Sequence, residues 1–321
     1  NGVDQAGVPE GRRLRVAVLM GGMSSEREVS LKTGGKVIEA LDPARYEAFA
    51  VDPRPRAEGC AWLETLAREP VDVAFIALHG RFGEDGTIQG LLEMLGIPYT
   101  GSGVLASALA IHKAQSKQIY RGAGIPTPES VELERSMDAE AIRERVAGFP
   151  IPAVVKPSRE GSTIGITIVR ERARMDAAVE LAFRHDASVL VERFVAGVEI
   201  TAAVIGNAAP QALPLIEIVP RSGFYDYEMK YTPGATEEIV PARISPESTA
   251  RAQDLAVRAH LALGCRGVSR TDMIVAEDEI WVLETNTIPG MTETSLLPRA
   301  AAGAGIPFPR LVEMLIEYAL E

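Results

Sequence analysis

The stretch RVAVLMGGMSSEREVSLKTGGKVIEAL, residues 15–41, sets the pattern from which the fold is predicted. Its first six residues are almost all apolar and predict a buried β-strand. Two glycines then permit a tight turn, and the serines that follow can cap a helix that runs to about Leu41. The stretch therefore predicts a strand, a turn and a helix that open an α/β domain.

The same alternation continues to residue 112. Further strands are predicted at 46–52, 73–78 and 97–100, with helices at 61–68 and 87–95. Continuous apolar strands that alternate with helices indicate a parallel sheet covered on both faces. Residues 1–112 are therefore predicted to form a Rossmann-like α/β domain, after a disordered lead over residues 1–13 without a signal-peptide pattern.

Two further units are predicted after this domain. The unit 113–200 is expected to have helices at 113–121 and 174–185 and strands at 152–156, 165–169 and 188–193. The unit 201–321 is expected to have strands at 198–206, 211–219, 268–275 and 280–285 and helices at 246–263, 295–303 and 309–320. Within the last unit, residues 221–242 form a long irregular segment, which in a compact domain is typically a functional lid or is disordered.

The composition is that of an ordinary globular protein. The chain has 321 residues, of which 46% are hydrophobic and 24% charged, and this length suits two or three structural units. A net charge of −11 argues against a nucleic-acid binder, and the longest apolar run, 104–111, is too short to span a membrane. Cys60 and Cys265 form no disulfide or metal-binding pattern and are interpreted as reduced core residues of a cytoplasmic protein.

Three oxygen-bearing side chains near the C-terminus predict a metal site. If the last two predicted strands form a hairpin centred on Asp278, Asp272 lies directly opposite Glu284. Side chains alternate along a strand, so Asn286 shares the face of Glu284. Two carboxylates and an amide oxygen suit Mg²⁺, which also shares substrate phosphates. The alternative is an exposed acidic face on the hairpin.

A loop rich in Gly and Ser predicts a phosphate site. Residues 156–165, KPSREGSTIG, join two predicted strands and begin with Lys156. Small residues allow backbone N–H groups to surround phosphate oxygens. The loop lacks the Walker pattern, and the alternative is a plain β-turn.

Glu26 and His79 are expected at the carboxyl edge of the parallel sheet, where α/β sheets bind ligands. Glu26 follows the glycine turn after the first strand, and His79 directly follows the strand 73–78. The alternative for Glu26 is a purely local role at the helix N-terminus, where acids are favoured.

The irregular segment contains FYDYEMKY at residues 224–231. Three tyrosines and a lysine in one loop are typical of a lid that closes over a ligand and excludes water. The alternative is an ordinary surface loop.

Six stretches occur in an order that resembles the D-alanine–D-alanine ligase family, within the ATP-grasp superfamily. They are VAVLMGGMSSEREVSL, ALHGRFGEDGTIQGLLEMLGIPYTGSG, VVKPSREGSTIGI, FYDYEMKY, GCRGVSRTDM and LETNTIPGMTETSLLP. The match is collinear from about Arg15 to the C-terminus, and the ordered set is far more specific than any one stretch. The resemblance implies a Rossmann-like domain followed by a two-part ATP-grasp fold.

The resemblance also implies roles for individual residues. The implied ATP contacts are Lys113, Lys156, Ser162, Glu192, Val195, Glu199 and Lys230. The implied ligands of Mg²⁺, which Mn²⁺ can replace, are Asp272, Glu284 and Asn286. The implied substrate contacts are Glu26, His79, Ser295 and Leu296. The implied catalytic groups are Glu26, Ser162, Tyr231, Arg270 and the backbone N–H of Gly290.

The reaction implied by the resemblance joins two D-alanines for peptidoglycan precursor synthesis in the cytoplasm. ATP phosphorylates the carboxylate of one D-alanine, and the amine of the second attacks the acyl phosphate. One alternative is a related ligase with D-lactate or D-serine as second substrate, and another is a non-catalytic binding module. The family also implies a homodimer, and some members respond to a monovalent cation; no nucleic-acid or membrane partner is expected.

Lysine is scarce in this chain, with six lysines against 27 arginines. Three of them, Lys113, Lys156 and Lys230, fall where the family places phosphate contacts. A compact ammonium acts as a point charge on phosphate, whereas the Arg fork suits bidentate contacts. The other three are expected on exposed helix faces: Lys32, Lys36 and Lys117.

Overall fold

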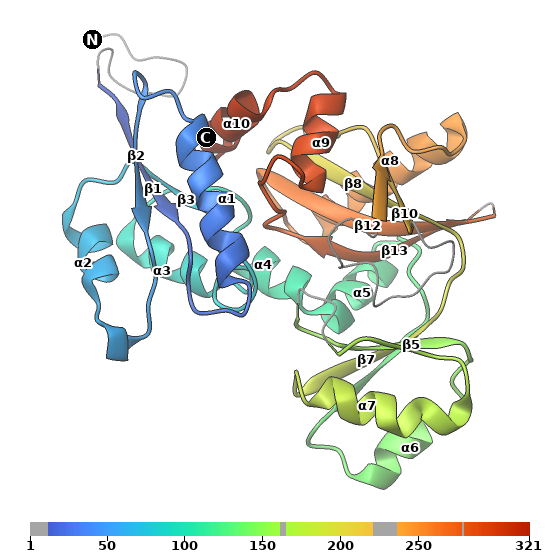
Figure 1. The fold of residues 1–321 in the computed structure, drawn as a ribbon. Helices are drawn as coiled ribbons and strands as arrows, with labels where there is room; N and C mark the ends of the chain where they lie inside the picture. The colour runs from blue at the N-terminus through green and yellow to red at the C-terminus, as the bar shows by residue number, and fades with distance from the viewer. Residues whose placement is uncertain (1–11, 161–164, 221–235, 278) are drawn as a thin grey trace.

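The computed structural model describes residues 12–160, 165–220, 236–277 and 279–321. Figure 1 shows three sheets, each accompanied by helices, with the first sheet in blue, the second in green and the third in yellow to orange. The predicted α/β class is confirmed. Segments 1–11, 161–164 and 221–235 and residue 278 lie outside the described residues, so most of the predicted lid falls there.

The first sheet is parallel, in the order β2-β1-β3. Its strands are β1 (Leu14–Leu19), β2 (Tyr46–Val51) and β3 (Val73–Ile76), and its helices are α1 (Arg27–Ala40), η1 (Arg56–Glu58), α2 (Ala61–Arg68), α3 (Thr87–Leu95) and α4 (Val104–Ile111). Val16 and Val18 of β1 face one core cluster with α1, while Ala17 and Leu19 face another with α2 and α3. Both faces are therefore covered, as predicted. The strand expected at 97–100 is reduced to an isolated bridge between Ala74 and Tyr99.

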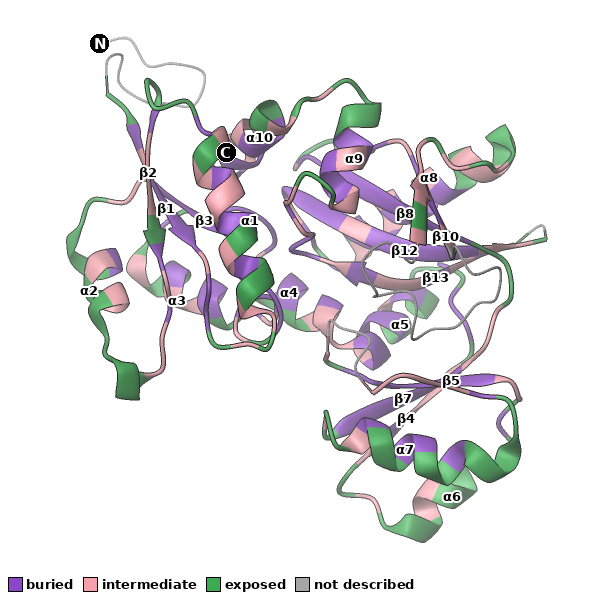
Figure 2. Ribbon diagram, in the orientation of Figure 1, coloured by how far each residue is buried: buried purple, intermediate pink, exposed green. Residues whose placement is uncertain are grey.

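The second sheet is antiparallel, in the order β4-β7-β5-β6. Its strands are β4 (Ser130–Glu134), β5 (Ala153–Pro157), β6 (Thr167–Val169) and β7 (Ser188–Arg193), and the helices of this region are α5 (Lys113–Gly122), α6 (Ala139–Ala147), η2 (Arg172–Arg174) and α7 (Met175–Phe183). Figure 2 shows β5 and β7 largely buried, whereas α6 and α7 have exposed outward faces.

The third sheet has the order β11-β10-β8-β12-β13, with β9 paired to β8. Its strands are β8 (Val198–Ile205), β9 (Gln211–Ala212), β10 (Ile216–Pro220), β11 (Thr236–Ile239), β12 (Val268–Ala276) and β13 (Glu279–Asn286), and its helices are α8 (Pro246–Ala262), α9 (Leu296–Gly303) and α10 (Phe308–Leu320). The single strand predicted at 211–219 is two strands, because Pro214 lacks the N–H that a continuous ladder needs.

Two predictions about burial are wrong. Cys60 is exposed at the N-cap of α2, so only Cys265 is a core residue. Lys117 was expected on an exposed helix face, yet its side chain is fully buried. Across the part of the chain that the structure describes, no helix is both long enough and apolar enough to cross a membrane.

Candidate functional site

A cleft beside α4, α5 and β13 brings together side chains from distant parts of the chain. Its polar lining includes Glu84, Lys113, Arg270, Glu284 and Asn286. Glu84 follows β3, Lys113 begins α5, and the other three lie on the β12–β13 hairpin. Residues predicted separately as nucleotide, metal and catalytic groups are therefore neighbours in space.

The β12–β13 hairpin places two predicted metal ligands opposite each other. At the end of the hairpin Ala276 pairs with Glu279, so the register there is not the one centred on Asp278, a residue that lies outside the described residues. A bulge between Asp272 and Met273 then shifts the register by one residue. Asp272 therefore faces Glu284 as predicted, and Asn286 lies two residues further along β13.

Neighbouring groups fix the buried carboxylate of Asp272. Thr201 Oγ1 donates to Oδ1 at 2.6 Å, and the Arg270 guanidinium donates to both oxygens at 3.1 Å. The Asn286 Oδ1 accepts the Ile288 N–H at 2.8 Å. No group of three or more His, Cys, Asp or Glu among the described residues is placed to hold a metal. The candidate set is instead two carboxylates and one amide oxygen, a hard oxygen donor set that fits Mg²⁺.

Lys113 connects the hairpin to the loop after β5. Its Nζ lies 3.1 Å from Glu284 Oε2 and donates to the Glu160 carbonyl at 2.7 Å. The Lys113 side chain is buried, so its charge is poorly screened by water. An anion bound in the cleft would therefore lie beside both the Lys113 ammonium and the candidate metal ligand Glu284.

Lys156 and Lys117 share one buried carboxylate. Lys156 Nζ on β5 lies 2.8 Å from Glu192 Oε1, and Lys117 Nζ on α5 lies 2.5 Å from Glu192 Oε2. Burial opposes ionisation of Glu192, but the two ammonium groups outweigh it and hold the pKa of Glu192 below its usual range. The end of β5 is therefore a positively charged point inside the protein.

The predicted adenine hinge is the connection between β7 and β8. Glu192 is on β7, Val195 lies in the connection, and Glu199 is buried on β8. A Cβ added to Gly197 would come within 2.3 Å of the Val275 carbonyl oxygen, so the connection packs directly against β12. The hinge is thus held between the second and third sheets.

Glu26 and His79 meet at the carboxyl edge of the first sheet, as predicted. Glu26 occupies the N-cap of α1, but its side chain makes no capping hydrogen bond. Its carboxylate lies beside Gly80, where an added Cβ would come within 2.8 Å of Oε2. Burial, reinforced by the negative charge of Glu84, raises the pKa of Glu26. A cationic group brought to this site would stabilise the ionised carboxylate of Glu26, which burial and Glu84 disfavour.

Both ring nitrogens of His79 have protein partners. Nε2 lies 3.1 Å from Thr33 Oγ1, and Nδ1 lies 3.5 Å from Glu84 Oε1. Ser24 Oγ donates to the His79 carbonyl at 2.6 Å, which ties the two edge loops together. Thr33 and Glu84 were not singled out from the sequence, although Glu84 lies in the run HGRFGEDG that carries His79.

The connection from β13 to α9 holds the remaining predicted residues. Ser295 Oγ lies 2.7 Å from Thr292 Oγ1 and accepts the Thr292 N–H at 3.1 Å. An added Cβ at Gly290 would come within 2.9 Å of Ser295 Oγ, so these two predicted residues are in contact distance. Leu296 begins α9 and packs against the core cluster. Three other predicted site residues lie outside the described residues: Ser162, Lys230 and Tyr231.

Comparisons with known proteins identify the family. A family model described as "D-ala D-ala ligase C-terminus" matches residues 119–317, and one described as "D-ala D-ala ligase N-terminus" matches residues 54–102. The chain belongs to the D-alanine–D-alanine ligase family. Its fold is therefore the ATP-grasp fold of these ligases, as the resemblance implied.

Individual members of the ligase family align with nearly the whole of this chain. A D-alanine–D-alanine ligase of Syntrophobacter fumaroxidans is 54% identical, with 96% of this chain and 98% of the relative covered. That of Desulforamulus reducens is 50% identical, with 96% and 99% covered. The structure of the Bacillus anthracis D-alanine–D-alanine ligase complexed with ATP has a TM-score of 0.83 at 37% identity, covering 97% of this chain and 98% of that one. The VanG D-Ala:D-Ser ligase of Enterococcus faecalis also has a TM-score of 0.83, at 35% identity, with 96% and 100% covered.

Proposed function

We propose that this ligase joins two D-alanines into D-alanyl-D-alanine, using ATP through an acyl-phosphate intermediate. The reaction would occur in the cytoplasm and supply a peptidoglycan precursor. The observation that carries the proposal is the cleft in which Lys113, Arg270, Glu284 and Asn286 converge. It combines cations for phosphate and oxyanion charge with oxygen ligands for a metal, and the relatives at 50% identity and above are named D-alanine–D-alanine ligases.

The nucleotide is assigned to the space between the second and third sheets. A free carboxylate is a poor electrophile, and phosphorylation turns one of its oxygens into part of a leaving group. Lys113 and Lys156 hold the phosphates and offset negative charge during phosphoryl transfer. Further contacts are assigned to Ser162 and Lys230 for phosphate, to Glu192 and Val195 for adenine, and to Glu199 for ribose.

Asp272, Glu284 and Asn286 would hold Mg²⁺, or Mn²⁺ in its place. When bound, the ion supplies positive charge to the phosphate oxygens. Thr201 and Arg270 orient Asp272 for this role through the hydrogen bonds described above. A monovalent cation is a further candidate activator.

The ligation step is assigned to groups on both sides of the cleft. Glu26 receives the ammonium of the first D-alanine, and His79 holds the edge loop. Ser162 and Tyr231 are assigned as hydrogen-bond partners of Glu26. Arg270 and the Gly290 N–H stabilise the oxyanion formed when the second amine attacks the acyl phosphate. An amide bond then forms as inorganic phosphate leaves. Ser295 and Leu296 receive the carboxylate and side chain of the second D-alanine.

The direct test is amino-acid-dependent ADP formation with analysis of the product. D-Alanine should stimulate ADP release and yield the dipeptide, whereas L-alanine should not. Equal ADP formation with L-alanine would contradict the proposal, and nucleotide binding without turnover would favour a non-catalytic module. A D-lactate ester or D-alanyl-D-serine as the main product would instead favour the alternative second substrates.

A substitution of Arg270 tests the oxyanion assignment. Arg270→Ala should lower kcat by roughly 10²–10³-fold, the usual effect of removing one oxyanion donor. The matched control is Arg145→Ala at an exposed position of α6, which should leave kcat close to the wild-type value. Single-turnover rates measure the chemical step directly, and an unchanged rate in Arg270→Ala would refute the role.

The proposal includes a homodimer and a division of the chain into domains. The domains would be 1–112, 113–200 and 201–321, with the second boundary falling within β8. Met94 of α3 is 88% exposed, and Val104 and Leu105 of α4 are 41% and 71% exposed. An added Cβ at Gly90, one turn before Met94, would lie 3.9 Å from Val104, so α3 and α4 adjoin here. We name Met94, Val104 and Leu105 the α3–α4 patch, and a second copy of the chain is its proposed partner.

A further inference from the structure

We propose that Lys117 is a positioning residue for nucleotide binding: it neutralises Glu192, so that the positive charge of Lys156 remains effective at the phosphates. This inference rests on the proposed function, because it assumes that Lys156 binds ATP. It assigns a role to a lysine that the sequence pattern and the family motifs leave without one.

The first observation is the burial of the whole cluster. The Lys117 side chain has no exposed area, and Lys156 and Glu192 are each 3% exposed. Lys117 Nζ also donates to Thr127 Oγ1 at 2.7 Å, and Thr127 Oγ1 donates to the Val282 carbonyl at 2.7 Å. The side chain of Lys117, which projects from α5, is thus held by Glu192 on the hinge strand β7 and, through Thr127, is connected to the metal-side strand β13.

The second observation is the charge of the cluster. Each oxygen of Glu192 has its own ammonium partner, at 2.5 Å for Lys117 and 2.8 Å for Lys156. These three groups therefore carry one net positive charge. If Glu192 faced Lys156 alone, the pair would be neutral, and its attraction for a phosphate would be greatly reduced.

An excess positive charge inside a protein is costly unless an anion completes it. Burial lowers the pKa of Lys117 to about 8, although Glu192 opposes this shift. The ammonium is therefore still mostly protonated at neutral pH, but at a cost. A nucleotide phosphate beside Lys156 would add a negative charge next to this cluster, which is why we connect the cluster to ATP rather than to packing alone.

The test compares the affinity for ATP with the affinity for adenosine, which lacks phosphate. Calorimetry on the wild-type protein first tests the proposed function. If the wild-type protein does not bind ATP, the proposed function fails, and the role of Lys117 does not come into question. Lys117→Met keeps most of the side-chain length but removes the charge. The ratio of ATP to adenosine affinity should then fall about 10- to 100-fold, as expected for a unit charge several ångströms from phosphate at an effective dielectric constant near 20.

A double variant separates charge from packing. Lys117→Met with Glu192→Gln removes one positive and one negative charge, so the cluster regains its net charge through Lys156. The ratio should recover to within a few-fold of wild type. A ratio that stays low, or a loss of ATP and adenosine affinity in equal proportion in Lys117→Met, would overturn the inference and leave Lys117 a structural tie.

Thermal unfolding accompanies each binding experiment. If Lys117→Met does not fold, Glu192→Gln alone decides the question, because Gln still accepts a hydrogen bond from Lys156. The inference then expects a ratio of ATP to adenosine affinity no lower than in the wild type. A clearly lower ratio would show that the Glu192 charge assists phosphate binding, which is the opposite of what we propose.

Discussion

The carboxylate of Asp52 ties the glycine turn after β1 to the start of α1. Oδ1 accepts the Gly22 N–H at 3.0 Å and Arg27 Nη1 at 2.8 Å, while Oδ2 accepts Arg27 Nη2 at 2.6 Å. Burial opposes ionisation of Asp52, but the Arg27 guanidinium and the Gly22 N–H outweigh it and lower the pKa of Asp52. A single side chain therefore fixes the turn that immediately precedes Glu26.

Replacing this carboxylate should cost stability in a pH-dependent way. Asp52→Asn should lower the free energy of unfolding by about 1–2 kcal/mol at neutral pH, because charge-assisted hydrogen bonds are lost at a partly exposed site. The unfolded-state pKa is about 3.9 and the folded-state pKa is lower, so the wild-type advantage is fully present above about pH 5. It is lost as the pH falls through the folded-state pKa.

Urea unfolding between pH 7 and pH 3 measures the advantage of Asp52. The gap between wild type and variant should be constant from pH 7 to about 5 and should shrink below about 4. Asp254→Asn, at an exposed position of α8, is the control and should change stability by less than about 0.5 kcal/mol. A gap that widens in acid would contradict the assignment.

Two adjacent glycines in α1 provide a test at the scale of an element. A Cβ added to Gly34 would come within 2.5 Å of Met20 Cβ and 2.7 Å of Met20 Sδ, whereas one added to Gly35 meets nothing within 4 Å. Gly34→Ala should therefore destabilise the protein by about 1–3 kcal/mol, because the helix must move away from Met20, the residue that follows β1. Gly35→Ala should stabilise it by about 0.5–1 kcal/mol through helix propensity.

Thermal and urea unfolding of the two alanine variants check this pair directly. Both variants add the same methyl group to the same helix, so propensity cancels in the comparison. If Gly34→Ala is as stable as Gly35→Ala, then α1 does not pack against Met20 as closely as the structure indicates.

Elements with a strong local pattern could be predicted from the sequence, and weakly patterned ones could not. The helices 61–68 and 87–95 and the strand 188–193 occur with the predicted bounds. The strand β4 and the helix α6 were not predicted. SVELE alternates charged and apolar residues at a sheet edge, and α6 buries only Val146. For α6 a signal existed, because the Asp138 side chain accepts the Ala141 N–H as an N-cap.

The candidate site shows the same limit. The pairing of Asp272 with Glu284 could be predicted, but the turn register assumed for it was wrong, and a bulge restores the pair. A bulge depends on the two neighbouring strands and leaves no period in the sequence. The burial of Lys117 depends on a carboxylate on β7, far along the chain, so helix periodicity alone could not indicate it.

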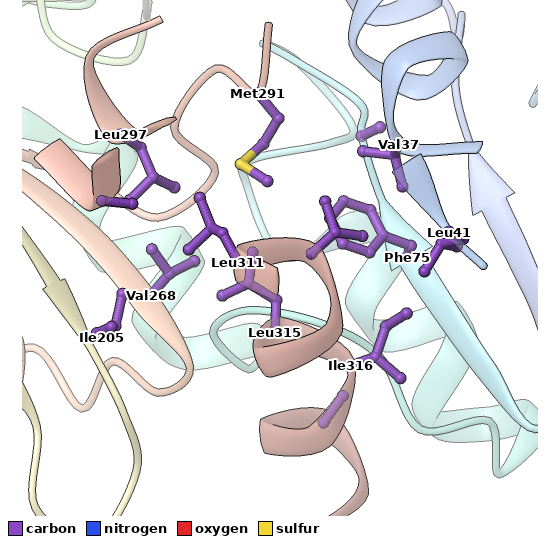
Figure 3. Close-up of a cluster of buried hydrophobic side chains, with 14 of the residues drawn as sticks. Val37, Leu41, Phe75, Ile205, Val268, Met291, Leu297, Leu311, Leu315 and Ile316 are labelled. Carbon is purple, nitrogen blue, oxygen red and sulfur yellow. The ribbon is translucent and has the colours of Figure 1, made fainter. Parts of the chain in front are cut away.

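At the scale of the whole molecule, the C-terminal helix α10 packs between the first sheet and the third sheet. Figure 3 shows Leu311, Leu315 and Ile316 of α10 between Phe75 of the first sheet on one side and Val268 of the third sheet on the other. All five side chains are buried in one cluster. Because this core spans both sheets, α10 fixes the first sheet, which carries Glu26 and His79, relative to the hairpin that carries the metal ligands.

The α3–α4 patch lies apart from this core and tests the proposed dimer. Met94→Glu combined with Leu105→Glu places two like charges on each copy of a self-complementary surface. A twofold interface brings the same patch from each copy together, so the charges would repel across it and the protein should become a monomer. Light scattering after gel filtration should give twice the mass of one chain for the wild type and a single-chain mass for the variant. Leu261→Glu, at a 55% exposed position on α8, is the matched control and should remain a dimer. A dimeric double variant would place the interface elsewhere, and a monomeric wild type would remove the homodimer from the proposal.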